Sequence, residues 1–455
     1  MLTWRVPALY GTLGGTALAA GALLASPAGM WWALAGVTGL VLLLTGLDWL
    51  VAAPAGEVQL TRSGPRQVRL GDSVEITLTV TNVSLRTLRG LVRDAWVPSA
   101  GADGPYAHPV DLEPGESAQV VTRLTPTRRG DRPAVRVTIR SYGPLGLAFR
   151  QTSQRRAARL TPPWTVTALP PFTSRRFLPE KLSRLRVLDG QTVARGRGQG
   201  TEFDALREYV VGDDVRSIDW RGTARSGQVM VRTWRPERDR RVLCVIDTGR
   251  TSAGRVAAVP VPGAATPPGE PRLDAAIDAA LLLAVLASHA DDRVDLLAVD
   301  TRIRATVGGA TKRTQLDRLT RTLAGLQPAL VETDFGLVAG ELMRAGRKRS
   351  LVVVFTALDP GALGEGLLPV LPQLVARHTV LVAAVQDPSL RVLAADRAGT
   401  AELHVAAAAE RSLAELDRVQ RALTRYGVHV VQAPVETLAS AVADRYLSLK
   451  AAGRL

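Results

Sequence analysis

Carboxylates occur at two places in the sequence where they could bind a metal or a ligand. The first is a cluster between residues 202 and 219. Acidic side chains alternate there with arginines. Hard divalent cations take several oxygen ligands, so the cluster could hold a metal and serve a metal-dependent hydrolase. Each carboxylate has an arginine within a few positions, however, and mutual neutralisation is the commoner outcome. The acidic residues are Glu202, Asp204, Glu208, Asp213, Asp214 and Asp219.

A glycine run precedes this cluster at Gly196, Gly198 and Gly200. Its backbone N–H groups could face a phosphate, but the run does not match a nucleotide loop that ends in Gly-Lys-Ser/Thr. Flexible turns use glycine in the same way, and we prefer that interpretation.

The second group centres on Asp247, which ends the continuous apolar run Val242 to Ile246. Such a run is typical of a central strand that is covered on both faces. From Arg241 onward, strand-like and helix-like segments alternate to the end of the chain, which predicts a doubly wound α/β domain over 241–455. Ligands bind such sheets outside the carboxyl ends of the central strands, so Asp247 marks the place to look for a site.

The segments of this domain follow from apolar runs and helical stripes. Thr301 to Val307 is expected to return as an edge strand. The other expected strands are 293–299, 351–356, 379–386 and 428–432, and the expected helices are 273–289, 312–326, 335–344, 367–377, 406–426 and 434–451.

Residues 56–170 have a different pattern. Side chains alternate with period two over Val74 to Val80 and again over Ala134 to Arg140. Further short β-prone runs at 57–61, 88–96 and 118–124 are separated by Gly- and Pro-containing turns. The spacing predicts a small antiparallel, immunoglobulin-like β-sandwich. No catalytic constellation is visible in it, so its expected role is spacing or docking.

Two uncharged apolar stretches open the chain, and each can cross a bilayer at 1.5 Å per residue. They predict two transmembrane helices within 1–55, at about 6–25 and 30–52. Tryptophans lie at their ends, as in an aromatic belt. The alternative for the first stretch is a cleaved signal peptide. The tryptophans are Trp4, Trp31, Trp32 and Trp49.

Positive charge sets the orientation of this hairpin. The connection between the stretches carries none, while Arg5 precedes them and Arg62, Arg66 and Arg69 follow. Both tails are therefore expected on the cytoplasmic side. This predicts a multi-pass protein of the plasma membrane whose soluble domains are cytoplasmic and whose arginines attract anionic lipid.

The net charge of +15 comes from 57 Lys+Arg against 42 Asp+Glu. Almost all the cations are arginine in a background rich in Ala, Gly and Pro, which favours a composition bias over a nucleic-acid surface. A basic surface that binds nucleic acid or anionic lipid remains the alternative. Cys244 is the single cysteine, which excludes an intrachain disulfide framework.

The segment 171–240 carries a family resemblance. Its charged and aromatic string closely resembles the signature of the family called "domain of unknown function 58". Arg128-Arg129-Gly130, Gly143 to Leu147 and the C-terminal Tyr446-Leu447 with Lys450 to Leu455 resemble other parts of that family. The signature residues, with an expected structural or docking role, are Glu202, Phe203, Asp204, Arg207, Glu208, Tyr209, Gly212, Asp213, Asp214, Arg216, Asp219, Trp220 and Arg225.

The resemblance implies a membrane-anchored protein with a C-terminal domain similar to a von Willebrand factor A domain, and a MoxR-type AAA+ ATPase as partner. Such A domains often bind a divalent metal through an Asp-x-Ser-x-Ser motif, a Thr on a second loop and an Asp on a third. Asp247, Thr251 and Thr333 match parts of that pattern here.

The pattern is degenerate, because Gly249 replaces the first Ser and Ala357 replaces the third-loop Asp, with Asp359 two positions late. Arg250 adds a positive charge inside the motif. Losing a hydroxyl and a carboxylate should weaken metal binding severely. Mg²⁺ is the one cofactor that the pattern leaves open, and the loops can still serve as a docking surface.

No catalytic residue is predicted. The sequence favours a non-enzymatic adaptor, anchored in the membrane, whose A-like domain docks a partner. A hydrolase built on 202–219 and a basic binding surface are the alternatives.

Overall fold

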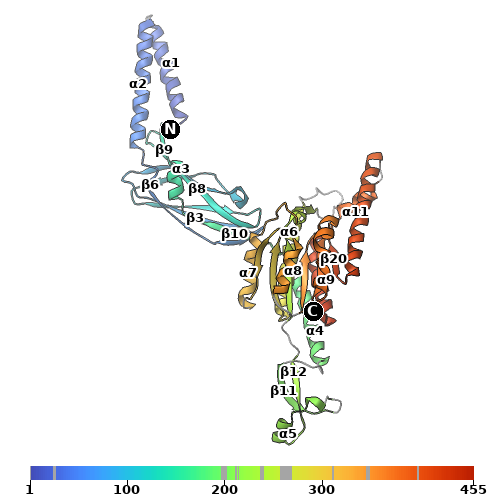
Figure 1. The fold of residues 1–455 in the computed structure, drawn as a ribbon. Coiled ribbons are helices and arrows are strands. Elements are labelled where there is room, and N and C mark those ends of the chain that lie inside the picture. Colours follow the sequence, from blue (N-terminus) through green and yellow to red (C-terminus); the bar gives the residue numbers. More distant parts are fainter. Residues whose placement is uncertain are drawn as a thin grey trace. The chain divides into compact units, whose positions relative to one another are not determined.

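A computed structural model describes residues 2–23, 27–195, 202–210, 213, 215–235, 240–256, 269–309, 312–344, 349–396 and 399–455 (Figure 1). The chain forms two compact units, Met1–Leu169 and Pro170–Leu455.

The N-terminal unit begins with helices α1 (Arg5–Leu23) and α2 (Pro27–Val51). They pack side by side, and the hydroxyl groups of Tyr10 and Thr38 lie 3.1 Å apart. Within the described residues, one helix is long and apolar enough to cross a membrane: Ala28–Val51, with a mean hydropathy of 1.9. This supports the second of the two expected spans.

A buried carboxylate joins α2 to the β region of the same unit. Asp48 is 1% exposed and accepts hydrogen bonds from the N–H groups of Leu145 (2.7 Å), Leu147 (2.7 Å) and Ala148 (2.8 Å). A Cβ atom on Gly143 would overlap Asp48. The glycine at the start of the 143–147 segment is therefore needed for this close approach.

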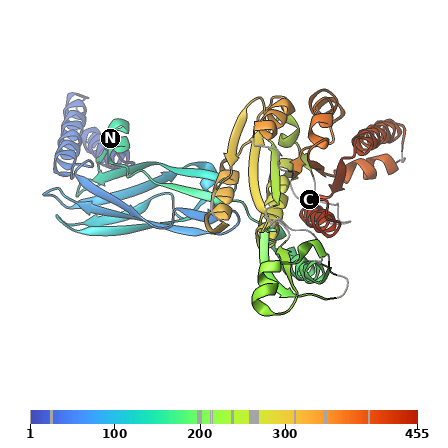
Figure 2. The ribbon, with the colours of Figure 1, turned by 60° about the horizontal axis from the view of Figure 1, so that its bottom comes forward.

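The β region consists of two sheets that share a core, seen as two layers in Figure 2. Leu78 and Val120 of one sheet pack in one cluster with Val92 and Ile139 of the other. All strand pairs are antiparallel except β2 with β10. The first sheet has the order β1-β3-β7-β5 and the second β2-β10-β8-β4-β6, with β9 beside β8. The elements are β1 (Val58–Ser63), β2 (Gln67–Arg69), β3 (Val74–Asn82), β4 (Leu88–Trp96), η1 (Pro98–Ala100), β5 (Ala102–Asp103), β6 (His108–Leu112), β7 (Ser117–Leu124), β8 (Gly130–Tyr142), β9 (Phe149–Gln151), α3 (Gln154–Leu160) and β10 (Thr165–Leu169).

Two of the arginines read as topology signals are used inside this fold. Arg62 and Asp94 form an ion pair at 2.5 Å with side chains 0% and 1% exposed. The guanidinium of Arg66 lies over the ring of Trp164 at 4.2 Å. Buried in this way, Arg62 does not supply the free surface charge that the positive-inside argument assumed, whereas Arg66 remains exposed.

A mixed, mostly parallel sheet forms the centre of the C-terminal unit, in the order β17-β16-β13-β18-β19-β20. Only β17 runs antiparallel, at the edge where the sequence predicted a returning strand. The alternation of strands and helices is thus confirmed. The strands are β13 (Arg241–Asp247), β16 (Arg293–Val299), β17 (Ile303–Val307), β18 (Ser350–Phe355), β19 (Thr379–Val385) and β20 (His429–Ala433).

Helices cover both faces of this sheet (Figure 2). On one face, Leu282 of α6 packs with Tyr446 of α12 and Leu323 of α7. On the other, Val338 of α8 packs with Leu371 of α9. The remaining elements are η4 (Arg250–Ala253), β14 (Arg255–Val256), β15 (Glu270–Pro271), α6 (Arg272–His289), α7 (Lys312–Gly325), α8 (Phe335–Arg344), the π-helix η5 (Ala362–Leu367), α9 (Leu371–Val375), α10 (Ser389–Ala395), α11 (Thr400–Arg425) and α12 (Val435–Ala451).

Part of the expected signature segment belongs to this α/β core. After η2 (Thr173–Phe177), helix α4 (Leu178–Arg195) buries Leu185 in the cluster that holds α6 and α12. Lys181, 2% exposed, forms an ion pair with Asp444 of α12 at 2.8 Å. The apolar residues of α4 are separated by charged residues, so its helical periodicity is weak and the sequence analysis did not predict this helix.

The rest of the signature segment forms a small module of its own. Strands β11 (Glu202–Glu208) and β12 (Met230–Arg235) pair antiparallel, with η3 (Val215–Ser217) and α5 (Trp220–Ser226) between them.

Candidate functional site

Asp247 ends β13 at the point where the strand order reverses. Strand β13 lies between β16 and β18; the chain continues from β13 outward to β16 and from β18 outward to β19, in opposite directions. This is the topological switch point, where open α/β sheets place their ligand crevices. The expected position of the site is therefore the position of Asp247, and Thr356 follows β18 next to it.

Four donors surround the carboxylate of Asp247, which is 2% exposed. Its Oδ1 accepts from the Gly249 N–H at 2.7 Å and from the Thr333 hydroxyl at 2.5 Å. Its Oδ2 accepts from the hydroxyls of Thr251 at 2.8 Å and Thr356 at 2.6 Å. The structure thus brings together all three residues that the sequence proposed here and adds Thr356.

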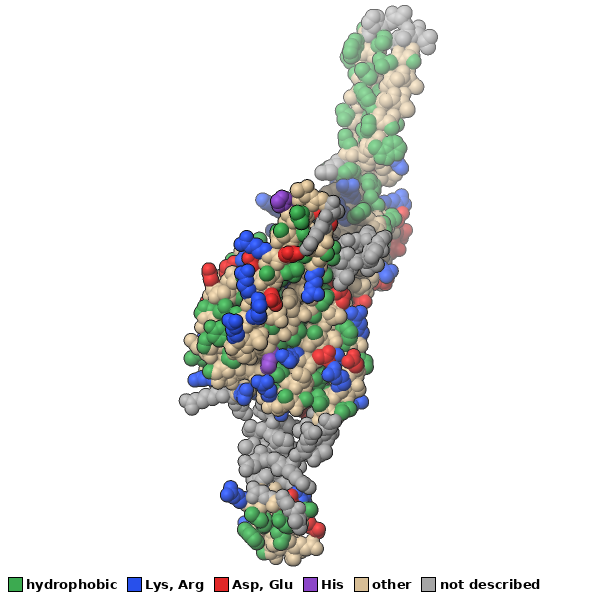
Figure 3. Space-filling model, turned by 90° about the vertical axis from the view of Figure 1, so that its right-hand side faces the viewer, with side chains coloured by type: hydrophobic (Ala, Val, Ile, Leu, Met, Phe, Trp, Pro, Cys, Tyr) green, Lys and Arg blue, Asp and Glu red, His purple; other side chains and the backbone are tan. Residues whose placement is uncertain are grey.

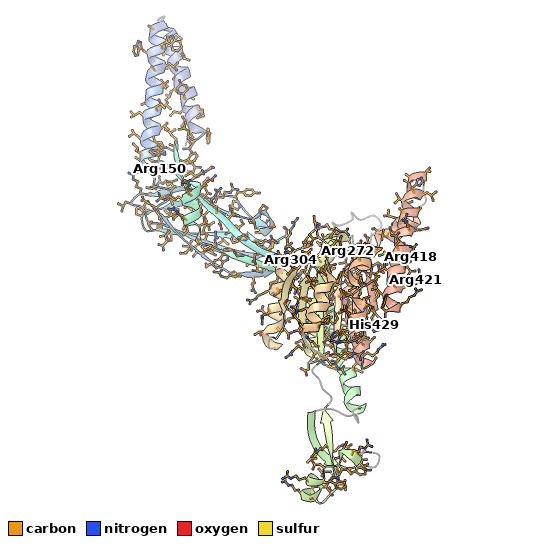
Figure 4. The ribbon with its side chains drawn as sticks, viewed as in Figure 1. Arg150, Arg272, Arg304, Arg418, Arg421 and His429 are labelled. Carbon is orange, nitrogen blue, oxygen red and sulfur yellow. The ribbon has the colours of Figure 1, made fainter. Side chains whose placement is uncertain are left out.

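A second buried carboxylate, Asp300, follows β16. It is fully buried and accepts from the Arg302 N–H at 3.1 Å and the Thr248 hydroxyl at 3.4 Å. Arg304, labelled in Figure 4, forms an ion pair with it. Burial alone would raise the pKa of Asp300, but these hydrogen bonds and the guanidinium hold that pKa below its ordinary value.

Two loops meet above Asp247 through backbone hydrogen bonds. The Ala329 N–H donates to the Thr248 carbonyl at 2.7 Å, and the Arg250 N–H donates to the Val331 carbonyl at 2.8 Å. The side chains of Arg250 and Glu332 form an exposed ion pair at 2.7 Å. Loops 248–252 and 329–333 therefore make one connected surface, which we call the carboxyl-edge platform.

The residues of this site do not fit a divalent metal. Both oxygens of Asp247 are occupied by donors rather than open to a cation. A Cβ atom on Gly249 would overlap the Thr333 hydroxyl and lie 2.8 Å from the Val331 carbonyl, so the serine of the metal motif has no room. Asp359, the displaced third-loop carboxylate, caps the N–H of Ala362 instead. The donor set is one carboxylate and three threonine hydroxyls, too little negative charge for Mg²⁺.

Little space exists beside Asp247 for a small substrate. The adjoining cavity, lined by Ser252, Arg272 and Phe355 among others, has a volume of about 10 Å³. That is room for about one water molecule. Arg272 (Figure 4) has its buried Nε without a hydrogen-bond partner in the described part of the chain. This geometry suits a rigid support beneath a surface better than a catalytic pocket.

Two carboxylates of the signature module are paired with arginines. Asp213 pairs with Arg207 at 2.6 Å, and Asp219 pairs with Arg232 at 2.7 Å. Asp219 also caps α5, accepting from the Gly222 N–H at 2.8 Å, and this bond is the largest cause that lowers the pKa of Asp219. Mutual neutralisation is what the structure has at both positions, which disfavours a hydrolase built on them.

Other signature residues have different places. The Tyr209 N–H donates to the Val229 carbonyl at 2.8 Å. Trp220 is 71% exposed. Glu208, Arg216 and Arg225 are also exposed. Glu202, Phe203 and Asp204 belong to β11 by their backbone, while their side chains, and the whole of Gly212 and Asp214, lie outside the described residues.

The C-terminal family pattern holds a third buried carboxylate. The Tyr446 hydroxyl donates to Asp292 at 2.5 Å, and Lys450 Nζ lies 3.0 Å from both oxygens of Asp292. Burial raises the pKa of Asp292, and Lys450 opposes that rise. These residues tie α12 to the start of β16, which is a structural role.

Fold and site define an α/β domain with a polar centre at the carboxyl edge of its sheet, preceded by an antiparallel β region and N-terminal helices. Residues 205–429 match the family model described as protein of unknown function DUF58. Uncharacterized proteins of Mycobacterium tuberculosis and Mycobacterium bovis are 28% identical over 205 residues, which is 44% of this chain and 60% of each relative. The chain thus spans about 60% of the length of these curated relatives.

Solved structures resemble about a quarter of the chain. The CARDB domain of the PF1109 protein from Pyrococcus furiosus is 14% identical, covering 26% of this chain and 90% of that one, with a TM-score of 0.19. A FixG-related protein from Vibrio parahaemolyticus is 10% identical, covering 25% and 96%, with a TM-score of 0.18.

Proposed function

We propose that the whole chain belongs to this family and is a membrane-anchored, non-enzymatic adaptor. Its C-terminal unit is a von Willebrand factor A-like domain that docks a MoxR-type AAA+ ATPase. The strand order with one antiparallel edge supports the A-like assignment, and the family resemblance supports the partner. The β region, immunoglobulin-like in this proposal, spaces that domain from the anchor.

The anchor in this proposal is the hairpin of α1 and α2 in the plasma membrane. Large apolar side chains of α2, such as Leu42 and Leu43, are exposed along its length. Trp31 and Trp32 at one end and Trp49 at the other are exposed as well, as in an interfacial belt. The two-span, multi-pass topology with cytoplasmic soluble domains follows from the uncharged connection and from Arg5 before the hairpin.

One observation carries the docking role: an exposed leucine on the carboxyl-edge platform. Leu330 is 81% exposed, and it lies beside the Arg250–Glu332 ion pair and above a site with no open metal position. An apolar side chain with flanking charges, on loops fixed by backbone hydrogen bonds, has the apolar-core and polar-rim arrangement of a protein interface. Docking at this platform needs no metal in our proposal, because Asp247 is already satisfied by the chain's own donors.

Copurification of the full chain from membranes tests the proposal. We expect an AAA+ ATPase to copurify in a nucleotide-dependent manner, and the Leu330→Asp variant to lose it. The control is Leu316→Asp, which replaces an exposed leucine of α7, outside loops 248–252 and 329–333, and should retain the ATPase. If no ATPase copurifies in the presence of either ATP or ADP, the proposed partner is wrong. If both variants lose the ATPase to the same extent, the proposed docking surface is wrong.

A further inference from the structure

Arginines gather where the two N-terminal helices meet the β region. Arg150 donates from Nε to the Trp49 carbonyl at 3.0 Å, and its guanidinium lies 4.3 Å from the centre of the Trp49 ring (Figure 4). Arg86 donates to the Leu50 carbonyl. Arg5, at the start of α1, lies 3.4 Å from the Leu145 carbonyl. Three segments far apart in sequence thus bring positive charge to the end of one apolar helix.

Helix α3 adds three more arginines beside the chain that leaves α2. Arg156 donates to the Gly56 carbonyl at 3.3 Å. Leu160 packs against the core cluster that contains Ala53 and Ala55. All three arginines of α3 are exposed: Arg155, Arg156 and Arg159.

These charges are not neutralised by the fold. Within the described residues, none of the six arginines forms a salt bridge with a carboxylate. Asp48 lies among them, but it is buried and already accepts three backbone N–H groups. Six guanidinium groups are therefore left to bind an anion from outside.

Apolar side chains lie next to these arginines on the surface. Leu85, 95% exposed, precedes Arg86, and Trp4, 77% exposed, precedes Arg5. Figure 3 shows hydrophobic side chains along the helices that rise from this base. Aromatic and leucine side chains beside arginines at the end of an apolar helix are the chemistry of a membrane interface.

We propose that this arginine belt binds the headgroups of anionic phospholipids; the inference rests on the proposed membrane anchor. The belt is defined by Arg5, Arg86, Arg150, Arg155, Arg156 and Arg159. Guanidinium groups bind phosphate oxygens in a bidentate manner. Each arginine near an anionic surface strengthens binding about fivefold, and this attraction falls with salt.

Native mass spectrometry of the full chain in neutral detergent tests the belt, with phosphatidylglycerol and phosphatidylcholine as competing lipids. We expect the native chain to retain phosphatidylglycerol in preference. The Arg155→Gln/Arg159→Gln variant should lose that preference about 25-fold. Arg86 and Arg150 also contact α2, so their replacement could disturb the fold. The lipid preference of the Arg86→Gln/Arg150→Gln variant is therefore interpreted only if its thermal midpoint matches that of the native chain.

The matched control is Arg123→Gln/Arg128→Gln, which removes two exposed arginines near Leu124 in the other core cluster of the β region. It should retain the preference. Equal binding of both lipids by the native chain, or equal loss in the control, overturns the belt. Tighter binding of duplex DNA with the same arginine dependence overturns it as well.

Extraction of the native chain from membranes by alkaline carbonate separates this inference from the anchor on which it rests. A chain released by carbonate refutes the anchor itself. A chain that stays in the membrane but shows no lipid preference refutes only the belt.

Discussion

Placing a serine at position 249 would restore the residue of the metal motif, and the structure predicts that it damages the site instead. The Cβ atom of Gly249→Ser would overlap the Thr333 hydroxyl and stand 2.8 Å from the Val331 carbonyl. Thr333 must then move, and its hydrogen bond to Asp247 is lost. The Val331 carbonyl is backbone and cannot rotate away.

The expected loss of stability is about 3 kcal/mol. Overpacking of a tight site costs about 1–3 kcal/mol. A hydrogen bond to a charged group contributes about 1.5–3 kcal/mol, and the two terms overlap because both act through Thr333. For a domain of this size, such a loss lowers the Tm by about 6–12 °C.

Thermal unfolding of the full chain in neutral detergent, with and without Mg²⁺, measures this effect. The matched control is Gly254→Ser in the same loop, where the nearest atoms would lie 3.6 Å from the new Cβ atom, an ordinary contact. We expect a lowered Tm for the first variant, little change for the second, and no Mg²⁺ response in either. An unchanged Tm for Gly249→Ser, or a rise on adding Mg²⁺, refutes the reasoning.

Three further outcomes follow from buried or capped groups. Arg62→Leu leaves its buried partner unpaired and should cost about 3–5 kcal/mol in denaturant unfolding, whereas Arg89→Leu, from an exposed pair, should cost less than about 1. Burial raises the pKa of Cys244 to about 12, so a thiol reagent should label it only after unfolding, and rapid labelling of the native chain would contradict its place in β13. The pKa of Asp219 is lowered, so the stability of its cap on α5 is present above about pH 4 and lost as pH falls; the protection of the Gly222 amide, measured relative to its intrinsic exchange rate at each pH, should fall in that range, unlike in Asp219→Asn.

The buried core of the C-terminal unit was predictable because its strands are continuous apolar runs. Helix α8 and strand β16 have the predicted bounds, and the edge strand β17 lies within the predicted range. The position of Asp247 followed from the same logic, because it ends a continuous apolar strand, whereas Thr251 and Thr333 were proposed only from the family resemblance. Thr356 was missed because the motif comparison looked for a carboxylate one residue later, at Ala357.

Segments dense in charge were less predictable. Helices α3 and α4 carry their apolar positions among arginines, so their periodicity is weak. Helix α10 was not expected, and α11 begins at Thr400 rather than 406, because no residue of α11 before Ala406 is buried and its first turn carries no apolar stripe. The arginine belt could not be predicted from the sequence, because its members are far apart in the chain and come together only in the folded protein.

The contact between Asp48 and the 145–148 backbone also has a consequence for biogenesis. The partners of Asp48 are synthesised up to 100 residues after it. During synthesis α2 therefore leaves the ribosome with a lone carboxylate near its end, well before the N–H groups that will satisfy it exist. The end of α2 gains these hydrogen bonds only when the turn between β8 and β9 has formed, so in the anchor that we propose, folding of the β region would complete the end of α2.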